Sequence, residues 1–237
     1  MANTYFKFKQ FIIHQDKCAM KVGTDGVLLG AWATCENAEK VLDIGTGTGL
    51  IALMIAQRSI ANIDAIEIDE AACLQAHENF RKSPWEDRIN LIHQSFQNFI
   101  NETDKKYDLI VTNPPYFQNS LVAPDDQRTK ARHNSELELY DIIDGTNKLL
   151  TENGTLSIIL PYVEGVLFIA KAAEHGLYCV RQTNVIPKPK APIKRLLLEF
   201  KRQKQAFIDQ DLTIELDNRH EYSENYKNLT RDFYLFL

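Results

Sequence analysis

Short apolar runs alternate regularly with segments of helical pattern along this chain, which leaves few folds open to it. The apolar runs have the length and composition of buried strands, and the segments between them repeat their apolar residues at helical spacing. The expected strands are 40–44, 60–68, 89–93, 107–112 and 155–160, and the expected helices are 48–58, 70–82, 136–150 and 164–174. Because parallel strands need a crossover connection, usually a helix, this order predicts an α/β fold with a parallel sheet covered on both faces.

After Gly176 the pattern changes. Segments 177–185 and 195–201 are both typical of strands, and the residues between them include three prolines, which exclude a helix. Without a helical crossover the two strands should pair antiparallel. We therefore predict a seven-stranded, mostly parallel sheet with an antiparallel hairpin at one edge and helices on both faces.

Length and composition favour one domain. The chain has 237 residues, of which 44% are hydrophobic, so it can bury a full core. We expect a single domain over 1–237, in which 37–204 form the core, 1–36 precede it, and the C-terminal segment 205–237 packs onto it, because its last part is rich in aromatic residues.

Nothing in the sequence predicts a membrane or secreted protein. No stretch approaches the roughly 18 consecutive apolar residues that a membrane helix needs, and the start of the chain lacks the apolar core of a secretory signal. We therefore expect a cytoplasmic location. The four cysteines form no Cys-x-x-Cys pair, which argues against a zinc site and against a disulfide framework.

Charge is unevenly distributed along the chain. The net charge of −5 argues against a protein that coats nucleic acid without selectivity. Basic residues nevertheless gather in one stretch, against the single acid Glu199: Arg181, Lys188, Lys190, Lys194, Arg195, Lys201, Arg202 and Lys204. Such a basic stripe fits one docked polyanion, and an ordinary solvated face is the alternative.

A glycine-rich turn follows the first core strand. Asp43 and Ile44 run into Gly45-Thr46-Gly47-Thr48-Gly49 and then into a helix. Glycines let the backbone approach a ligand at the helix N-terminus, where free N–H groups and the helix dipole favour an electron-rich partner. The spacing G-x-G-x-G differs from the G-x-G-x-x-G of dinucleotide sites. We expect Asp43, Gly45, Gly47 and Gly49 to bind a cofactor, although Asp43 could instead only stabilise the turn.

Two further positions complete the expected cofactor site. Glu67, at the end of the next strand, is placed to accept two hydrogen bonds from adjacent ribose hydroxyls, which favours an adenosine-bearing cofactor. Ser95 and Phe96 follow the third strand, where an adenine ring is expected. Backbone groups there would meet the ring edge and Phe96 its face, unless Phe96 is a core residue.

The motif Asn113-Pro114-Pro115-Tyr116 directly follows the strand 107–112. An ordinary turn is one reading of Asn-Pro-Pro. Its place at the carboxyl end of a buried strand favours a functional reading, because open α/β sheets bind their ligands there. With the glycine turn upstream, the motif suggests a methyl donor held beside an exocyclic amine. The long polar segment that follows is expected to be a loop.

The glycine turn, Glu67 and the Asn-Pro-Pro-Tyr motif together resemble class I S-adenosylmethionine-dependent methyltransferases that act on a planar amine. More narrowly, the blocks 6–11, 18–26 and 28–33 resemble the bacterial tRNA(Val) (adenine-37-N6)-methyltransferase family. The resemblance covers nearly the whole chain. It implies a Rossmann-like fold, S-adenosyl-L-methionine as cofactor, tRNA as partner, methylation of adenosine 37 of valine tRNA, no metal and a monomer.

The resemblance also implies roles for the motif. The Asn113 side-chain oxygen and the Pro114 carbonyl would accept the two hydrogens of the target amine and draw its lone pair out of the ring plane, while Tyr116 stacks on the base. Proline keeps these acceptors aimed, so preorganised acceptors replace a strong base. Asn113 would also contact the cofactor, and Pro115 and Phe117 the base.

Further contacts follow from the same resemblance. Thr24 and Asp25 would contact the methionine end of the cofactor under the segment 1–36, or would cap a helix at 27–32. The candidates for contacts with RNA phosphates are Arg128, Lys130, Arg132, Lys188, Lys190, Lys194 and Arg195.

Three alternatives stay open. An enzyme that methylates a protein glutamine at N5 would present a similar planar amine, but such enzymes look to carry a larger helical module, and only about forty residues precede the glycine turn here. An rRNA guanine N2-methyltransferase is the second. The third is a non-catalytic module that binds RNA or protein, against which the intact acceptors argue.

Overall fold

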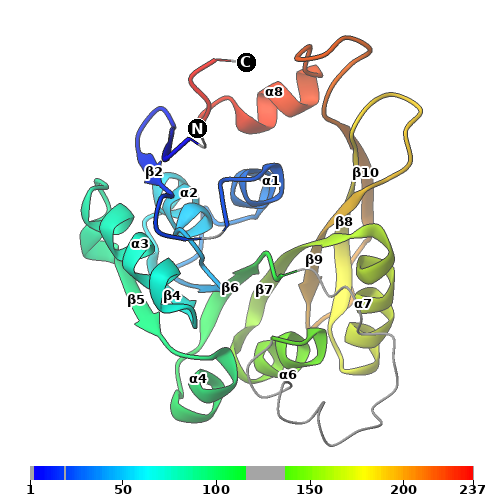
Figure 1. Ribbon diagram of the computed structural model, residues 1–237. Helices are drawn as coiled ribbons and strands as arrows, with labels where there is room; N and C mark the ends of the chain where they lie inside the picture. The colour runs from blue at the N-terminus through cyan, green and yellow to red at the C-terminus, as the bar shows by residue number, and fades with distance from the viewer. Residues whose placement is uncertain (1–2, 19, 116–136, 237) are drawn as a thin grey trace, which may run out of the picture.

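The computed structural model describes residues 3–18, 20–115 and 137–236 (Figure 1). Within them, eight strands form one sheet in the order β10-β8-β9-β7-β6-β3-β4-β5. The strands are β3 (Lys40–Ile44), β4 (Asn62–Glu67), β5 (Ile89–His93), β6 (Tyr107–Thr112), β7 (Leu150–Pro161), β8 (Tyr178–Ile186), β9 (Arg195–Lys201) and β10 (Ile208–Thr213). A separate hairpin pairs β1 (Tyr5–Lys7) with β2 (Ile12–His14).

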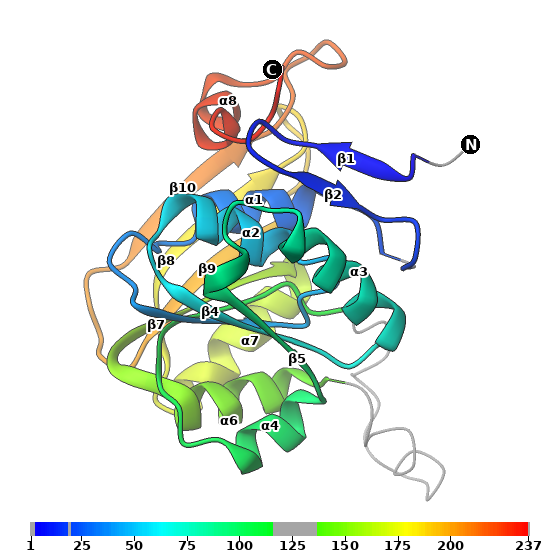
Figure 2. The same ribbon diagram turned by 90° about the vertical axis from the view of Figure 1, so that its left-hand side faces the viewer.

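Helices cover both faces of this sheet, as Figures 1 and 2 show. One face carries α1 (Thr24–Trp32), α2 (Leu50–Arg58) and α3 (Glu70–Arg81), and the other carries α4 (Phe96–Glu102), α6 (Leu139–Leu149) and α7 (Tyr162–Glu174). A short 3-10 helix spans Glu86–Arg88, and α8 (Glu224–Thr230) lies near the C-terminus. Among the described residues, no helix has both the length and the apolar character needed to cross a bilayer.

Strand alternation explains the two-layered core. Successive residues of a strand point to opposite faces, so Val41 packs in the core under α1 to α3, and Leu42 in the core under α4, α6 and α7. Leu197 and Leu198 divide in the same way on β9. Both faces of the central strands are therefore buried, which confirms the predicted α/β class with its parallel central sheet.

The sheet topology corrects one prediction. The sheet has eight strands, where seven were expected, because β10 pairs in parallel with β8. The antiparallel pair β8–β9 exists as predicted, but β10 covers it, so the pair does not form the edge. The reason is the composition of β10: its sequence Ile-Asp-Gln-Asp-Leu-Thr is polar, and Leu212 is its one buried residue. An exposed edge strand of this kind carries little apolar signal.

Strand direction gives the sheet two distinct ends. β3 to β7 run parallel, and β8 and β10 run in the same direction, so all of them finish at one end, here called the carboxyl end. β9 runs the other way and begins there, with Arg195 opposite Pro161 and Val185. The opposite end is here called the amino end. α8 packs beside α1, and the loop between β1 and β2 meets the C-terminal segment, where Lys9 N–H donates to Phe233 O at 2.8 Å.

Candidate active site at the carboxyl end of the sheet

The glycine turn forms an open cradle between β3 and α2. Gly45, Gly47 and Gly49 all have positive φ, at 69°, 56° and 83°, which favours glycine strongly. A Cβ added to Gly45 or Gly47 would meet nothing within 4 Å, whereas one on Gly49 would lie 2.3 Å from the ring of Phe80. Gly45 and Gly47 therefore leave room for a ligand, and Gly49 allows α3 to pack closely.

Glu67 fastens this cradle to the end of β4. One of its oxygens accepts a hydrogen bond from the N–H of Gly47 at 2.8 Å, and the other accepts from the N–H groups of Ile68 and Asp69 at 2.8 and 2.9 Å. A carboxylate offers about four acceptor positions, so about one stays available for a ligand. The two hydrogen bonds from ribose hydroxyls that are predicted for Glu67 would therefore require the hydrogen bond from the Gly47 N–H to break.

Asp43 lies beneath the turn and is completely buried. Its Oδ2 accepts a hydrogen bond from Thr46 Oγ1 at 2.6 Å, while its Oδ1 has no hydrogen-bond partner among the described groups. Burial raises the pKa of Asp43 to about 7, against the hydrogen bond from Thr46 and the backbone N–H of Ala52, which faces the carboxylate without a hydrogen bond of good geometry and also favours its charged form. The orphaned oxygen is the kind of group that a bound ligand or ordered water satisfies.

Asn113 and Pro114 lie directly beside the cradle. Thr112 ends β6 opposite Ile44 of β3, and its Oγ1 donates to the Ile44 carbonyl at 3.0 Å. Neighbouring strands lie about 4.8 Å apart, so Asn113 and Gly45 leave the sheet side by side. Asn113 is half-buried, Pro114 is buried and Pro115 is exposed. Amide and carbonyl acceptors thus emerge next to an open backbone turn.

The hydroxyls of Thr46 and Thr112 were not predicted from the sequence as part of this site. Thr46 follows Asp43 by three residues, a spacing at which hydroxyl and carboxylate groups close local turns, so that signal could have been read. Thr112 bonds across strands, and the pairing of β3 with β6 had to be known first. Tyr116, Phe117, Arg128, Lys130 and Arg132, which complete the predicted substrate contacts, lie outside the described residues.

Ser95 and Phe96 have structural roles. Ser95 caps α4, because its Oγ accepts from Asn98 N–H at 3.2 Å. Phe96 is 4% exposed, and its ring fills the space above Gly145, where an added Cβ would lie 2.3 Å from it. The ring therefore packs in the core, which favours the core alternative, and the contact of Ser95 and Phe96 with an adenine ring stays a prediction.

The start of α1 is tied to β9. The helix begins at Thr24 with Gly23 as its N-cap, so neither Thr24 nor Asp25 is the cap. Asp25 forms an ion pair with Arg195, whose Nε donates to Oδ2 at 2.8 Å. Arg195 therefore holds the N-terminal segment against the sheet. The predicted cofactor contacts of Thr24 and Asp25 stay predictions.

The basic stripe divides between the two ends of the sheet. Lys188, Lys190 and Lys194 are exposed in the β8–β9 connection at the carboxyl end, whereas 201–204 lie at the amino end. Arg181 packs over Trp32 at 3.7 Å and pairs with Glu199 at 2.6 Å. The eight residues are therefore not one surface, and three lysines remain at the carboxyl end of the sheet, the end that holds the candidate site.

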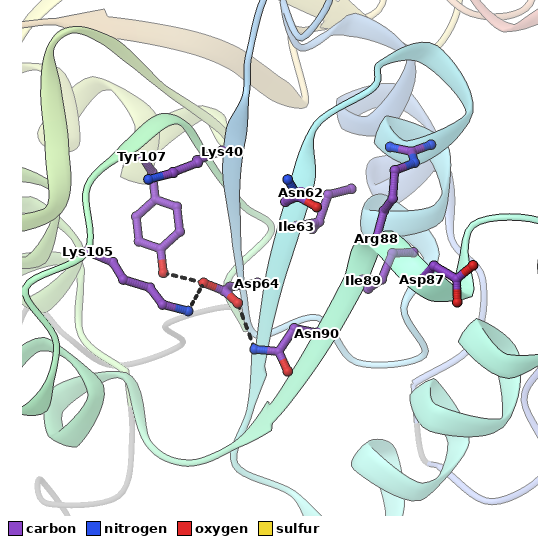
Figure 3. A pocket seen from close by; sticks show the side chains of 10 residues that line it. All are labelled: Lys40, Asn62, Ile63, Asp64, Asp87, Arg88, Ile89, Asn90, Lys105 and Tyr107. Atoms are coloured by element: carbon purple, nitrogen blue, oxygen red, sulfur yellow. Dashed lines mark hydrogen bonds and ion pairs between the residues drawn. The ribbon is translucent and has the colours of Figure 1, made fainter.

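A cavity of about 430 Å³ lies at the opposite, amino end (Figure 3). Its central carboxylate, Asp64, accepts hydrogen bonds from Asn90, Lys105 and Tyr107 at 2.7, 2.8 and 2.7 Å. Burial acts to raise the pKa of Asp64, but these bonds outweigh it and lower the pKa. The carboxylate of this cavity is thus already satisfied by neighbouring side chains. Among the described residues, no cluster of His, Cys, Asp and Glu has the arrangement of a metal site.

Comparison with known proteins gives the chain a family. The model of the methyltransferase small domain family matches residues 22–166. A Bacteroides thetaiotaomicron protein named tRNA1(Val) (adenine(37)-N6)-methyltransferase is 52% identical over 239 residues, covering 100% of both chains. A Parabacteroides distasonis protein of the same name is 50% identical, covering 99% of both.

Solved structures with similar folds are more distant. A predicted O-methyltransferase from Agrobacterium tumefaciens superposes with a TM-score of 0.68 at 18% identity, over 88% of this chain and 96% of that one. A ribosomal protein L11 methylase from Lactobacillus delbrueckii subsp. bulgaricus gives 0.52 at 21% identity, over 76% and 77%. At this identity the similarity shows the fold alone.

Proposed function

This chain belongs to the methyltransferase small domain family and, within it, to the tRNA1(Val) (adenine(37)-N6)-methyltransferases, and on that premise we propose that it methylates the 6-amino group of adenine 37 in a valine tRNA. S-adenosyl-L-methionine is the methyl donor of this reaction. The one geometric observation that carries the chemistry is that Asn113 and Pro114 emerge beside the open glycine turn, held there by the bond from Thr112 to Ile44.

The cradle fits the proposed cofactor. Gly45 and Gly47 leave open space at the start of α2, where backbone N–H groups and the helix dipole favour electron-rich groups. Glu67 keeps about one acceptor position for a ribose hydroxyl, and Asp43 Oδ1 is an unsatisfied acceptor beneath the turn. When bound, S-adenosylmethionine supplies an electrophilic methyl group on a positively charged sulfur.

The motif at the end of β6 prepares the amine. The lone pair of an adenine amino nitrogen is delocalised into the ring, so the nitrogen is a weak nucleophile. The Asn113 side-chain oxygen and the Pro114 carbonyl accept its two hydrogens, which draws the lone pair out of the ring plane. The same acceptors would stabilise positive charge on the nitrogen as it takes the methyl group from the sulfonium. The electrons of the broken C–S bond would stay on the sulfur, which leaves as a neutral thioether, and the methylated nitrogen would then lose one proton to water.

Positioning the base requires it to leave its stack. A loop nucleotide can do so at low cost, which suits a target in the anticodon loop. Tyr116 and Phe117 would stack on the base, with Pro115 at the rim, and Arg128, Lys130 and Arg132 would contact phosphates together with Lys188, Lys190 and Lys194. We propose that these groups act within a single-domain monomer in the cytoplasm.

The specific substrate separates this proposal from its alternatives. Relatives named for adenine 37 match the whole chain at about half identity, which favours tRNA over a protein glutamine or an rRNA guanine. The test is transfer of a labelled methyl group to total small RNA from a strain that lacks the protein, followed by nucleoside mass spectrometry. We expect labelled N6-methyladenosine at position 37 of valine tRNA. Labelled methylguanosine or a labelled polypeptide would instead support a rival enzyme.

A matched control addresses the non-catalytic alternative. The Asn113→Ala variant should still bind S-adenosylmethionine by calorimetry but transfer little label. If the wild-type protein binds tRNA yet transfers no methyl group to any fraction, the chain is a binding module, and the proposal is wrong.

A further inference from the structure

A second groove lies at the carboxyl end, beside β8 and β10. It has a volume of about 470 Å³ and is formed between the β1–β2 hairpin, the start of α1 and the C-terminal segment. Five of its lining side chains are aromatic, and a carboxylate joins them: Phe6, Tyr222, Tyr226, Tyr234, Phe236 and Glu215. We call it the aromatic groove. The sequence drew attention to these C-terminal rings only as core candidates.

The rings form a connected row with a fixed floor and an open rim. Tyr222 stacks on Tyr226 with centroids 5.2 Å apart, and Tyr226 lies 6.5 Å from Tyr234, which meets the edge of Phe6 at 6.0 Å. Tyr226 is buried and Tyr222 is half-buried. Phe236, at the rim, is 91% exposed. The groove therefore offers preorganised ring faces and a free ring that can close on a flat ligand.

Charge around the groove favours a base from single-stranded nucleic acid. Glu215 Oε2 lies 3.5 Å from Lys188 Nζ, so the groove borders the lysines of the β8–β9 connection. Aromatic platforms beside lysines are the usual way to bind unstacked bases and their phosphates. Acids between Glu215 and Glu224 would repel phosphates on the other side, so the RNA backbone would follow the lysine side.

The position of the groove fits a different nucleotide from the one that reacts. Ile214 and Glu215 of the groove follow β10, and β10 and β6 are four strand positions apart in the sheet, which corresponds to about 19 Å; Thr24, at the start of α1, also lines the groove. The distance from the β10 side of the groove to Asn113 is too long for one nucleotide to occupy both places and suits two nucleotides of one loop. Both places lie at the carboxyl end, so one bound RNA loop can reach both.

We propose that the aromatic groove binds a second unpaired base of the RNA substrate while the target adenine lies at Asn113. The Glu215 carboxylate selects a base whose edge donates hydrogen bonds. This inference rests on the proposed function, since it takes the bound RNA to be the substrate. It adds a binding subsite that is separate from the catalytic motif.

Alanine variants of two ring positions test the subsite. Phe236→Ala removes an exposed ring and Tyr222→Ala a half-buried one, and Phe207→Ala is the control, because Phe207 is 55% exposed at the other end of β10. We expect each groove variant to bind a valine anticodon stem-loop about 5- to 100-fold more weakly, the scale of losing one stacked base. S-adenosylmethionine binding by calorimetry and the Phe207→Ala variant should be unchanged.

A double-mutant cycle identifies the base. Stem-loops with one abasic loop position at a time are titrated against the wild type and Phe236→Ala. The proposal expects one position, other than the target adenine, at which the abasic change weakens binding to the wild type but no longer to the variant. Additive losses at every position, or ring variants that bind as the wild type does, would overturn it and leave the groove to another occupant.

The two proposals fail in distinguishable ways. If the wild type binds the stem-loop but does not methylate it, the proposed function is wrong. The double-mutant cycle then still shows whether the aromatic groove binds a base. If the wild type methylates the stem-loop and the ring variants bind it normally, the proposed function stands and the groove proposal is wrong.

Discussion

The two ends of the sheet use their polar groups differently. At the amino end, Asp64 accepts hydrogen bonds from three side chains, and Arg88 donates to the carbonyls of Ala61 and Ala56 at 2.8 Å each. At the carboxyl end, Asp43 keeps one buried oxygen without a partner, alone among the described carboxylates. The Asp64 carboxylate is therefore satisfied within the protein, whereas the Asp43 carboxylate keeps an acceptor that a ligand or an ordered water can satisfy.

This difference locates the site better than cavity size does. The cavity at the amino end is well formed, yet its carboxylate has a lowered pKa because its hydrogen-bond donors stabilise the charge. The pKa of Asp43 is raised because burial dominates there. An unsatisfied buried carboxylate oxygen costs free energy, which a ligand or an ordered water bound at this end would recover. The comparison predicts that equivalent substitutions at the two ends have different consequences.

The largest expected effect concerns two asparagines. Asn113→Ala should lower the rate of methyl transfer by about 10²–10³-fold, the scale of losing one preorganised group that stabilises charge. The affinity for S-adenosylmethionine should change little. Single-turnover transfer to valine tRNA measures the rate. Asn90→Ala, which removes a donor to Asp64 at the amino end, is the matched control and should keep full turnover. A variant of Asn113 that keeps turnover would remove it from the mechanism.

Two acids on one strand give the next contrast. Glu67 ends β4 at the carboxyl end, and Asp64 lies three residues earlier, toward the amino end. Glu67→Gln should weaken S-adenosylmethionine binding about 10- to 100-fold, since a hydrogen bond to a charged group is worth about 1.5–3 kcal/mol. Asp64→Asn should leave that affinity unchanged. Calorimetric titration decides, and equal affinities for the two variants would contradict the ribose role of Glu67.

A smaller effect should appear as pH dependence of stability. The folded protein keeps a proton on Asp43 up to about pH 7, whereas the unfolded chain gives it up near pH 4, so ionisation opposes folding. Stability should therefore fall as the pH rises, by about 2 kcal/mol between about pH 5 and pH 7, and Asp43→Asn should remove this slope.

Asp64 should have the opposite effect on the pH dependence of stability. Its lowered pKa means that its ionised form stabilises the fold, and this stability is lost only as the pH falls through acid values. Asp64→Asn should therefore flatten the acid side of the profile and leave the neutral side unchanged. Urea unfolding across the pH range measures both profiles. A wild-type profile that is flat near neutrality would show that Asp43 has a partner in solution.

The central fold could be predicted because its signal is local. β3, β6 and β9 coincide with the predicted strands, since strands buried on both faces are continuously apolar. β5 coincides as well, because its Ile-Asn-Leu-Ile run is apolar enough to be recognised although it is an edge strand. β10 was missed because an edge strand with exposed faces has no such run. α4 was missed because it is short, with seven residues, and polar on one side. The spacing of apolar residues in a sequence reflects burial, so helices and strands that bury few side chains give a weak signal.

The same distinction applies to the candidate site, whose local motifs could be predicted and whose long-range contacts could not. The glycine turn and the Asn-Pro-Pro motif follow strand ends directly, so their meeting at one end follows from parallel order. The pairing of Asp25 with Arg195 joins residues that are 170 positions apart, and no spacing rule predicts it. The interpretation of the basic stripe as one surface was wrong. Basic residues that are close in sequence on a hairpin lie at its tip and at its base, which are at opposite ends of the sheet.

The smallest expected effect tests the divided stripe with two matched pairs of lysines. Lys190 and Lys194 lie at the carboxyl end, and Lys201 and Lys204 at the amino end. Replacing the first pair with glutamine should lower the salt dependence of tRNA binding, with the slope of log K against log salt falling by about one per lost phosphate contact. The second pair, replaced in the same way, should leave the slope unchanged. Binding titrations over a range of salt concentrations compare two proteins of equal net charge, so any difference reports position. Equal slopes would mean that the whole protein's field attracts the RNA, and that the β8–β9 connection makes no phosphate contact of its own.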